Sequence, residues 1–221
     1  MKQLHRRILL SQTYRLSSDL RGSDDDPANV HLTRFARRRL EAEPIRDAML
    51  AISGQLDTVP ANGHPLPAWD QKRYGLNGPF HEEYASNKRS VYLLTQRLFD
   101  HSFLGLFDPP DRSATTAIRS SSDVPAQSLF LMNSPFIQQR ARAFAERLVR
   151  EWPDNDQRIV AAYRLAYGRS PGEAEHKALI DFLDGFDTDL SSEQTGAADR
   201  QRAWTSIARA LLTSNEFFFI D

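Results

Sequence analysis

The feature that most constrains the fold is a series of helix-start and helix-stop signals after residue 124. Ser134-Pro135 is a typical helix opening, because serine can cap a first turn and proline is tolerated at the first helical position. The apolar residues that follow recur every three or four positions: Ile137, Ala141, Phe144 and Leu148. This spacing predicts a helix with one buried face.

Further capping signals predict the helices that follow. Asp154 stands three residues before Gln157, as in a capping box, and Gly168 suits the left-handed residue that closes a helix. Ser170 begins the same capping pattern three residues before a glutamate and predicts the next helix, with four residues facing inward: Leu179, Phe182, Leu183 and Phe186. A final helix is predicted over 198–213, with three apolar residues on one face: Trp204, Ile207 and Leu211.

The first part of the chain carries weaker helix signals. Residues 2–12 predict a short helix, and Asp26 followed by a proline predicts the start of a second one. Helical spacing recurs from Ile45 towards Gly54, where the glycine can end the helix. Pro44 should break this helix from the preceding basic stretch, because proline lacks a backbone donor and clashes with the turn before it.

The middle of the chain has little periodicity. Residues 57–88 are rich in proline and glycine and predict a long surface excursion. Residues 90–95 have the composition of a strand, and 114–120 could be its antiparallel partner. The sequence therefore predicts a mainly α, multi-helix fold with a small β-hairpin near 90–120. It divides into three segments: 1–56, N-terminal and helical; 57–123, loop-rich with the hairpin; 124–221, a helical bundle.

Composition argues against several classes of function. The 28 Lys and Arg residues and 29 Asp and Glu residues leave a charge of -1, so nucleic acid is not an expected partner. The absence of cysteine removes disulfides, thiolate nucleophiles and C-x-x-C-H haem attachment. Apolar runs fall far short of the roughly 20 residues of a membrane span. The first residues also lack the apolar core of a signal peptide.

Two patterns that resemble catalytic or metal motifs do not predict such sites. Residues 168–172 match G-x-S-x-G, but a nucleophile elbow follows a strand, whereas here a helix precedes Ser170. Capping already accounts for that serine. The six histidines show neither H-x-H nor H-E-x-x-H spacing. We therefore expect no catalytic residue and no metal ligand in the chain.

Two groups of polar residues are the candidates for a ligand site. A histidine near guanidinium groups, as at the start of the chain, could bind an anion or move a proton, or it could be a half-buried structural residue. The segment from Arg39 to Asp47 places opposite charges three and four residues apart, as in Arg39 and Glu43 or Glu43 and Arg46. These charges could form a solvated helix face, a buried network or a polar site. The candidate polar ligand cluster is His5, Arg6, Tyr14, Arg15, Arg39, Glu43, Arg46, Asp47 and Arg89.

Several motifs occur in a fixed order along nearly the whole chain. They are Leu4-His5-Arg6, Arg46-Asp47, Lys88-Arg89-Ser90-Val91-Tyr92, Phe107-Asp108-Pro109-Pro110, Leu131-Met132-Asn133-Ser134-Pro135-Phe136 and Ser214-Asn215-Glu216-Phe217. In these motifs the chain resembles the C-terminal portion of the DUF1553 (PSD1) family, a domain of unknown function in planctomycete-type exported multidomain proteins.

The resemblance implies several properties that the residues alone do not. Modules of this family begin further upstream, so we expect a truncated start, with a DUF1549 module and, in many members, a haem-binding cytochrome-like domain before it. No cofactor is expected in this chain itself. The resemblance also implies a periplasmic or extracellular location.

Two functional hypotheses remain open at this stage. The first is a non-catalytic helical interaction or scaffold part of a larger exported, cytochrome-associated protein, whose partners are other domains of the polypeptide or other proteins. The alternative is a ligand-binding or catalytic part of a polysaccharide-processing enzyme, with carboxylates such as Glu43 and Asp47. Glycosidases need two carboxyl groups about 5 to 10 Å apart across a cleft. Convergence of the candidate residues in a concave pocket would favour the alternative.

Overall fold

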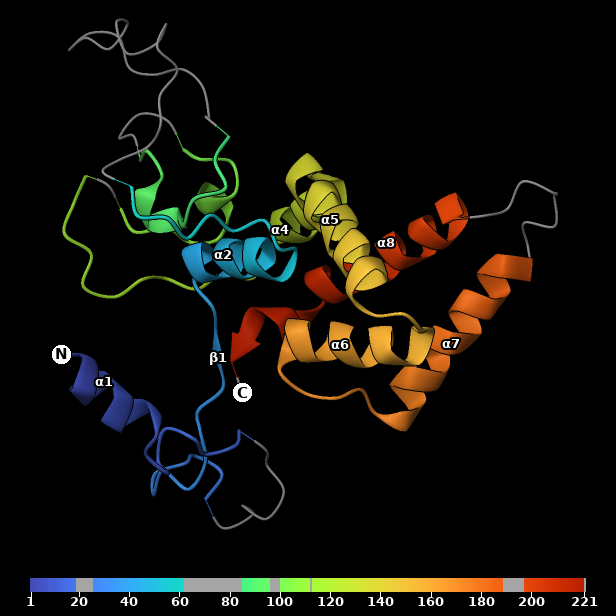
Figure 1. Cartoon of the computed structure of the whole chain (residues 1–221). Coiled ribbons are helices and arrows are strands. Elements are labelled where there is room, and N and C mark those ends of the chain that lie inside the picture. The colour runs from blue at the N-terminus through green and yellow to red at the C-terminus, as the bar shows by residue number, and fades with distance from the viewer. Residues whose placement is uncertain (19–25, 62–84, 96–99, 112, 189–196, 221) are drawn as a thin grey trace, which may run out of the picture. The chain divides into compact units, whose positions relative to one another are not determined.

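The computed structural model describes residues 1–18, 26–61, 85–95, 100–111, 113–188 and 197–220 (Figure 1). The chain forms two compact units, one of Met1–Leu40 with Phe218–Asp221 and one of Glu41–Phe217. This division differs from the three predicted segments. Helices dominate the described residues, so the predicted mainly α class is confirmed.

The first unit begins with helix α1, Lys2–Leu9, which confirms the helix predicted near the start. None of its residues is buried. The prediction that a helix begins at Asp26 is wrong. The Asp26 carboxylate instead accepts hydrogen bonds from the backbone N–H groups of Val30 and His31, both at 2.8 Å, and closes a turn. These bonds satisfy donors four and five residues ahead, whereas an N-cap side chain would satisfy those two or three ahead.

A two-stranded antiparallel sheet completes this unit. Strand β1, Arg38–Arg39, pairs with β2, Phe219–Ile220, with Arg38 opposite Ile220. The Arg37 guanidinium lies 4.9 Å from the centre of the Phe219 ring. The hairpin predicted near 90–120 is wrong in its position: Ser90–Tyr92 is a 3-10 helix and residues 114–120 contain no strand. The pairing that does form joins segments from opposite ends of the sequence.

The second unit is helical (Figure 1). Its elements are α2 (Ala42–Ile52), the 3-10 helices η1 (Ser90–Tyr92) and η2 (Leu104–Leu106), α4 (Pro125–Asn133), α5 (Pro135–Glu151), α6 (Asn155–Tyr167), α7 (Glu173–Thr188), α8 (Ala197–Thr213) and η3 (Asn215–Phe218). Helix α5 contacts α2, α4, α6 and α8, and it packs most extensively against α8. None of the helices in the described residues is long and apolar enough to cross a membrane.

Helix α5 forms as the sequence predicts. Ser134 is its N-cap residue and Pro135 its first helical residue. Its four predicted inward residues are all completely buried: Ile137, Ala141, Phe144 and Leu148. Full burial of each large apolar side chain stabilises the fold by about 1.5 to 3 kcal/mol. The predicted inward face of α8 is buried as well, with Trp204 at 1 % exposure.

The predicted boundaries of α6 are confirmed. The Asp154 carboxylate accepts a hydrogen bond from the Gln157 backbone N–H at 2.8 Å, which is the expected N-cap geometry. Gly168 closes the helix at φ +73°, in the left-handed region that glycine adopts without steric cost. Helix α2 likewise begins at Ala42, with Pro44 in its first turn, and the predicted break there is confirmed.

The predicted start of α7 is wrong by two residues. The helix begins at Glu173, directly after Gly172, and not after Ser170. The Gly172 backbone N–H donates to the Glu175 carboxylate at 2.7 Å, and the Gly172 carbonyl accepts from the His176 N–H at 2.9 Å. Gly172 therefore caps the helix. Phe182, predicted to face inward, is 39 % exposed.

The long surface excursion predicted over 57–88 falls mostly outside the described residues, which stop at 61 and resume at 85. Its two ends are held together, because the Asp57 N–H donates to the Asn87 carbonyl at 2.8 Å. Lys88 Nζ reinforces this junction at 2.6 Å from an Asp57 carboxylate oxygen. That hydrogen bond is the main cause that lowers the pKa of Asp57.

Candidate functional site

Helix α2 carries three of the predicted site residues, Glu43, Arg46 and Asp47, of which the last two act on the same segment. Ile45 and Met49 anchor the buried face of the helix, and the neighbouring Arg46 side chain is also carried inward, to 3 % exposure. Arg46 Nη1 donates to the Lys88 carbonyl at 3.1 Å and to Ser90 Oγ at 3.2 Å. Its Nη2 donates to the Ser86 carbonyl. The guanidinium thus fastens residues 86–90 to α2.

Asp47 fixes the same segment through Ser90. One carboxylate oxygen accepts from the Ser90 backbone N–H at 2.8 Å and from its hydroxyl at 2.7 Å. The same oxygen lies 3.7 Å from Arg46 Nη1, and the other lies 3.9 Å from Arg89 Nε. This anchoring explains the wrong hairpin prediction, because it holds Ser90 in the first turn of η1 instead of an extended strand.

Helix α5 contributes Arg140, a residue that the sequence analysis did not single out. It lies three residues after Ile137 and four before Phe144, so the helical spacing already places it on the buried face. The side chain is 6 % exposed. Its Nη1 donates to Asn87 Oδ1 at 3.3 Å. Burial lowers the pKa of the Arg140 guanidinium.

The ring of Phe136 lies close to both buried guanidiniums. The Arg140 guanidinium carbon is 5.3 Å from the ring centre and that of Arg46 is 5.7 Å from it. Both distances fall within the range of cation–π interactions. Together these residues form the arginine cluster: Arg46, Asp47, Arg89, Arg140 and Phe136.

The remaining predicted residues lie apart from the arginine cluster or in the other unit. Glu43 accepts a hydrogen bond from Arg119 Nη1 at 2.6 Å, and this bond is the main cause that raises the pKa of Arg119. In the first unit, Arg39 is part of β1. The other four predicted residues of that unit are exposed: His5, Arg6, Tyr14 and Arg15. Of the predicted set, the structure therefore brings together Arg46, Asp47 and Arg89.

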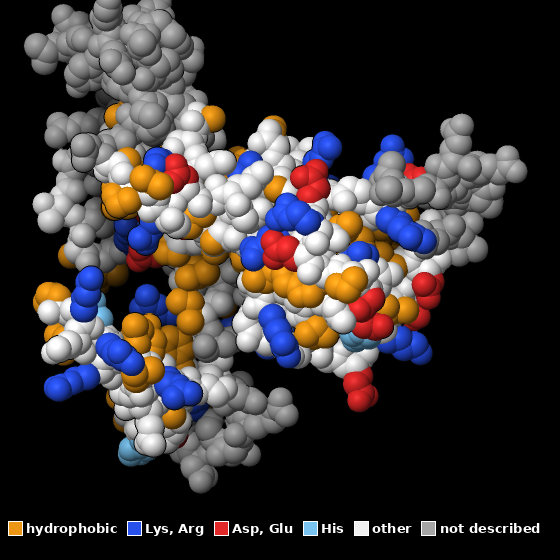
Figure 2. All heavy atoms as spheres, in the orientation of Figure 1, with side chains coloured by type: hydrophobic (Ala, Val, Ile, Leu, Met, Phe, Trp, Pro, Cys, Tyr) orange, Lys and Arg blue, Asp and Glu red, His pale blue; other side chains and the backbone are white. Residues whose placement is uncertain are grey.

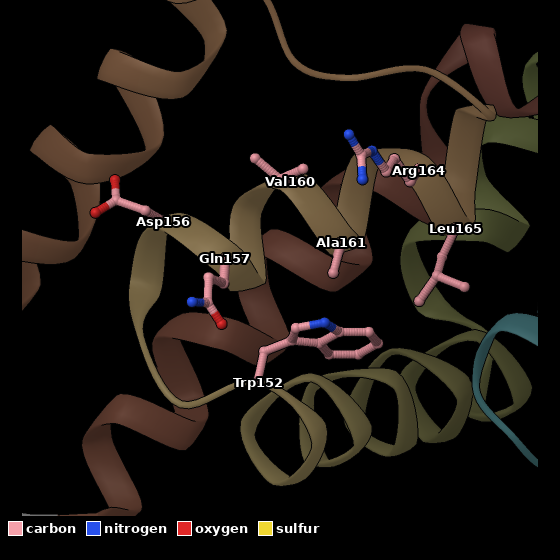
Figure 3. Close-up of a pocket in the computed structure, with 7 residues that line it drawn as sticks. All are labelled: Trp152, Asp156, Gln157, Val160, Ala161, Arg164 and Leu165. Atoms are coloured by element: carbon pink, nitrogen blue, oxygen red, sulfur yellow. The ribbon is translucent and has the colours of Figure 1, made fainter.

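A groove on α6 is the second candidate, and sequence reasoning missed it. It has a volume of about 520 Å³ and is lined by Trp152, Asp156, Gln157, Val160, Ala161, Arg164 and Leu165 (Figure 3). Six of these residues form two adjacent rows on α6, each with a spacing of four residues: positions 156, 160 and 164 form one row, and positions 157, 161 and 165 form the other. The small Ala161 lies at the middle of one row, next to the Trp152 indole. Trp152 follows directly after α5 and forms the wall opposite α6.

The groove has an apolar floor and charged ends. Hydrophobic side chains gather over α6 and the adjoining end of α5, with charged side chains around them (Figure 2). At one end, an Asp156 carboxylate oxygen lies 3.1 Å from His176 Nε2 of α7. At the other end, Arg164 is exposed. Pockets of 300 to 1,000 Å³ with mostly apolar linings are typical binding sites.

The family of the chain follows from a match to one family model. The model of PSD1, Protein of unknown function (DUF1553), matches residues 1–183. The chain belongs to the DUF1553 family. No curated protein and no solved structure matches it.

The DUF1553 match covers both candidate sites. Residues 46–47, 89, 136–140 and 152–165 all fall within it, and the match ends inside α7. Helix α8 lies beyond the matched residues, although its Trp204 is buried in the same core. The family description assigns no activity, so membership in DUF1553 leaves the role of both sites to be argued from their geometry.

Proposed function

We propose that the chain is a non-catalytic helical interaction module that docks an amphipathic helix of another domain or protein along α6. The observation that carries the proposal is the groove, with its two rows of side chains, the small Ala161 side chain at the middle of one row and Trp152 as the opposite wall. Rows of this spacing accept the side-chain ridges of a second helix. Apolar grooves of this kind bind helices through residues repeating every three or four positions.

Charge at the groove ends supports one docking arrangement. Asp156 and Arg164 are eight residues apart, roughly 12 Å along the helix axis. A partner helix with a basic residue facing Asp156 and an acidic residue facing Arg164 would complement both ends. Such rim charges chiefly set orientation and association rate, while the apolar centre supplies most of the affinity.

The polar residues favour binding over catalysis. Asp47 is engaged with Ser90 and Glu43 with Arg119, so both carboxylates act within the fold. A general acid or base must instead reach the proton that it transfers in a bound substrate. By the family resemblance, the partner is another domain of a larger exported, cytochrome-associated protein or a protein that binds to it.

A photo-crosslinking experiment on the full-length protein in its native cell tests this proposal. A benzoylphenylalanine replaces Gln157 in the groove, and the matched control replaces Arg142, which has a 74 % exposed side chain on α5 outside the groove. Mass spectrometry then maps the crosslinked peptide. We expect position 157, and not 142, to capture one amphipathic helical segment, and Val160→Asp to abolish the capture.

The outcomes separate the hypotheses. Equal crosslinking at both positions, or capture of a segment without helical apolar spacing, would contradict the proposal. Absence of any specific product at position 157 would contradict it as well. Circular dichroism of the Val160→Asp protein serves as the folding control.

A further inference from the structure

Arg140 of α5 is buried, and one edge of its guanidinium makes few contacts. Its Nε is buried and has no hydrogen-bond partner among the residues that the structure describes. Its Nη2 reaches only Gln139 Oε1, at 3.5 Å, and its Nη1 reaches Asn87 Oδ1 at 3.3 Å. Both acceptors are neutral amides on exposed residues. The edge formed by Nε and Nη2 is therefore largely unused.

Three more exposed arginines of the same unit have carboxylate partners, whereas Arg140 has none among the described residues. Arg119, Arg147 and Arg169 have side chains between 23 % and 41 % exposed, and each lies within 3.1 Å of a glutamate oxygen. An arginine stays charged even when buried. A buried charge without a counter-charge costs several kcal/mol. A bound anion from outside the described residues would balance the buried positive charge of Arg140.

The unused edge has the geometry of a carboxylate receptor. Nε and Nη2 present two parallel N–H donors, the fork that pairs with the two oxygens of a carboxylate. We propose that this edge of Arg140 binds one carboxylate, which displaces the exposed Gln139 amide and lies beside Asn87 and the Phe136 ring. The site is separate from the α6 groove and goes beyond the docking function.

A carboxylate fits better than a phosphate. The edge offers two donors and one positive charge, which balance a single carboxylate. A phosphate group carries nearly two negative charges and three acceptor oxygens, so it needs further donors. The neighbouring Arg46 directs its hydrogen bonds to Ser86, Lys88 and Ser90.

The test follows the Nε–H resonance of Arg140 by NMR in the full chain. Sodium acetate is titrated against sodium chloride and inorganic phosphate at equal ionic strength. We expect a saturable shift with acetate alone, half complete in the millimolar range that one weak ion pair provides. A blocked peptide with a single glutamate forms a further arm. Tighter binding of the peptide assigns the carboxylate to a protein segment, and tighter binding of acetate assigns it to a small molecule.

Variants complete the design. Arg140→Lys keeps the charge but loses the fork, so acetate should bind at least about tenfold more weakly, as read from amide shifts of Asn87 and Gln139. Arg142→Gln, two residues along the same helix, should bind as the native chain does. Equal shifts with chloride, tighter binding of phosphate, or unchanged acetate binding by Arg140→Lys would overturn the proposal. The native-chain titration decides by itself if Arg140→Lys does not fold.

Discussion

Replacement of Arg46 by methionine removes the guanidinium that joins α2 to residues 86–90 while it keeps most of the apolar volume. The native side chain is 3 % exposed and donates to the Ser86 and Lys88 carbonyls and to Ser90 Oγ. All three acceptors lose their donor in the variant. Asp47 also loses a positive charge 3.7 Å from its carboxylate.

The expected cost follows from these contacts. Each hydrogen bond contributes about 1 to 1.5 kcal/mol, so the three together amount to about 3 to 5 kcal/mol. This agrees with the cost of about 3 to 5 kcal/mol for removing one partner of a buried ion pair. For a chain of this size, 1 kcal/mol shifts Tm by about 2 to 4 °C. Arg46→Met should therefore lower Tm by about 6 to 20 °C.

Thermal melting by circular dichroism measures the effect, with Arg89→Met as the matched control. Arg89 belongs to the same cluster, but its side chain is 60 % exposed and 3.9 Å from Asp47, so its loss should cost less than about 1 kcal/mol. If Arg46→Met melts within 2 °C of the native chain, the guanidinium is not a structural clamp. The arginine cluster would then become a candidate ligand site.

Other changes test single elements of the fold. Asp154→Ala should cost about 1 kcal/mol in chemical denaturation, whereas Ser170→Ala should cost less than about 0.5 kcal/mol, because only Asp154 caps a helix. Gly168→Ala should cost about 1 kcal/mol because its φ is +73°. A hydrogen bond with Arg169 lowers the pKa of Glu175 to about 2 from 4.5, so this carboxylate stabilises the fold above pH 4.5 and loses its effect as the pH falls towards 2. Acid unfolding of Arg169→Gln should therefore lack the loss of stability that protonation of Glu175 causes in the native chain.

Helices α5 and α6 could be predicted because their determinants are local. Pro135 fits the first turn of α5, where the Ser134 carbonyl accepts from the Gln138 N–H, and Asp154 acts on a donor three residues ahead. The apolar stripe of α5 follows from helical spacing alone. Such signals need no knowledge of the rest of the chain.

Two of the errors arise where distant residues decide the local structure. Ser90 has a neighbourhood suited to a strand, but Asp47, 43 residues earlier, holds it in a 3-10 turn. The predicted start of α7 is wrong for a local reason: Gly172 precedes its first residue, Glu173, and Glu175, three residues ahead, accepts from the glycine N–H while it also binds Arg169. Strand pairing between residues 38–39 and 219–220 depends on contacts that local composition cannot predict.

Of the two candidate sites, one could have been predicted from the sequence and the other could not. Arg140 could have been found, because the stripe of α5 places it among buried positions, and a buried arginine is unusual enough to single out. The α6 groove could not, because it requires Trp152 to lie against the second row of α6. A covered helix face and an open one have the same sequence spacing.

The two proposed sites lie in different halves of α5, and this separation makes them independent. Arg140 is in the first half of the helix, and Trp152 follows its last residue, Glu151. Twelve residues of helix correspond to roughly 18 Å, beyond the 7 to 10 Å within which substitutions commonly couple. Trp152→Ala should therefore leave acetate binding at Arg140 unchanged, and Arg140→Lys should leave crosslinking from position 157 unchanged. Coupling between them would require α5 to move as a rigid element between two positions, because the two sites share no side chain among the described residues.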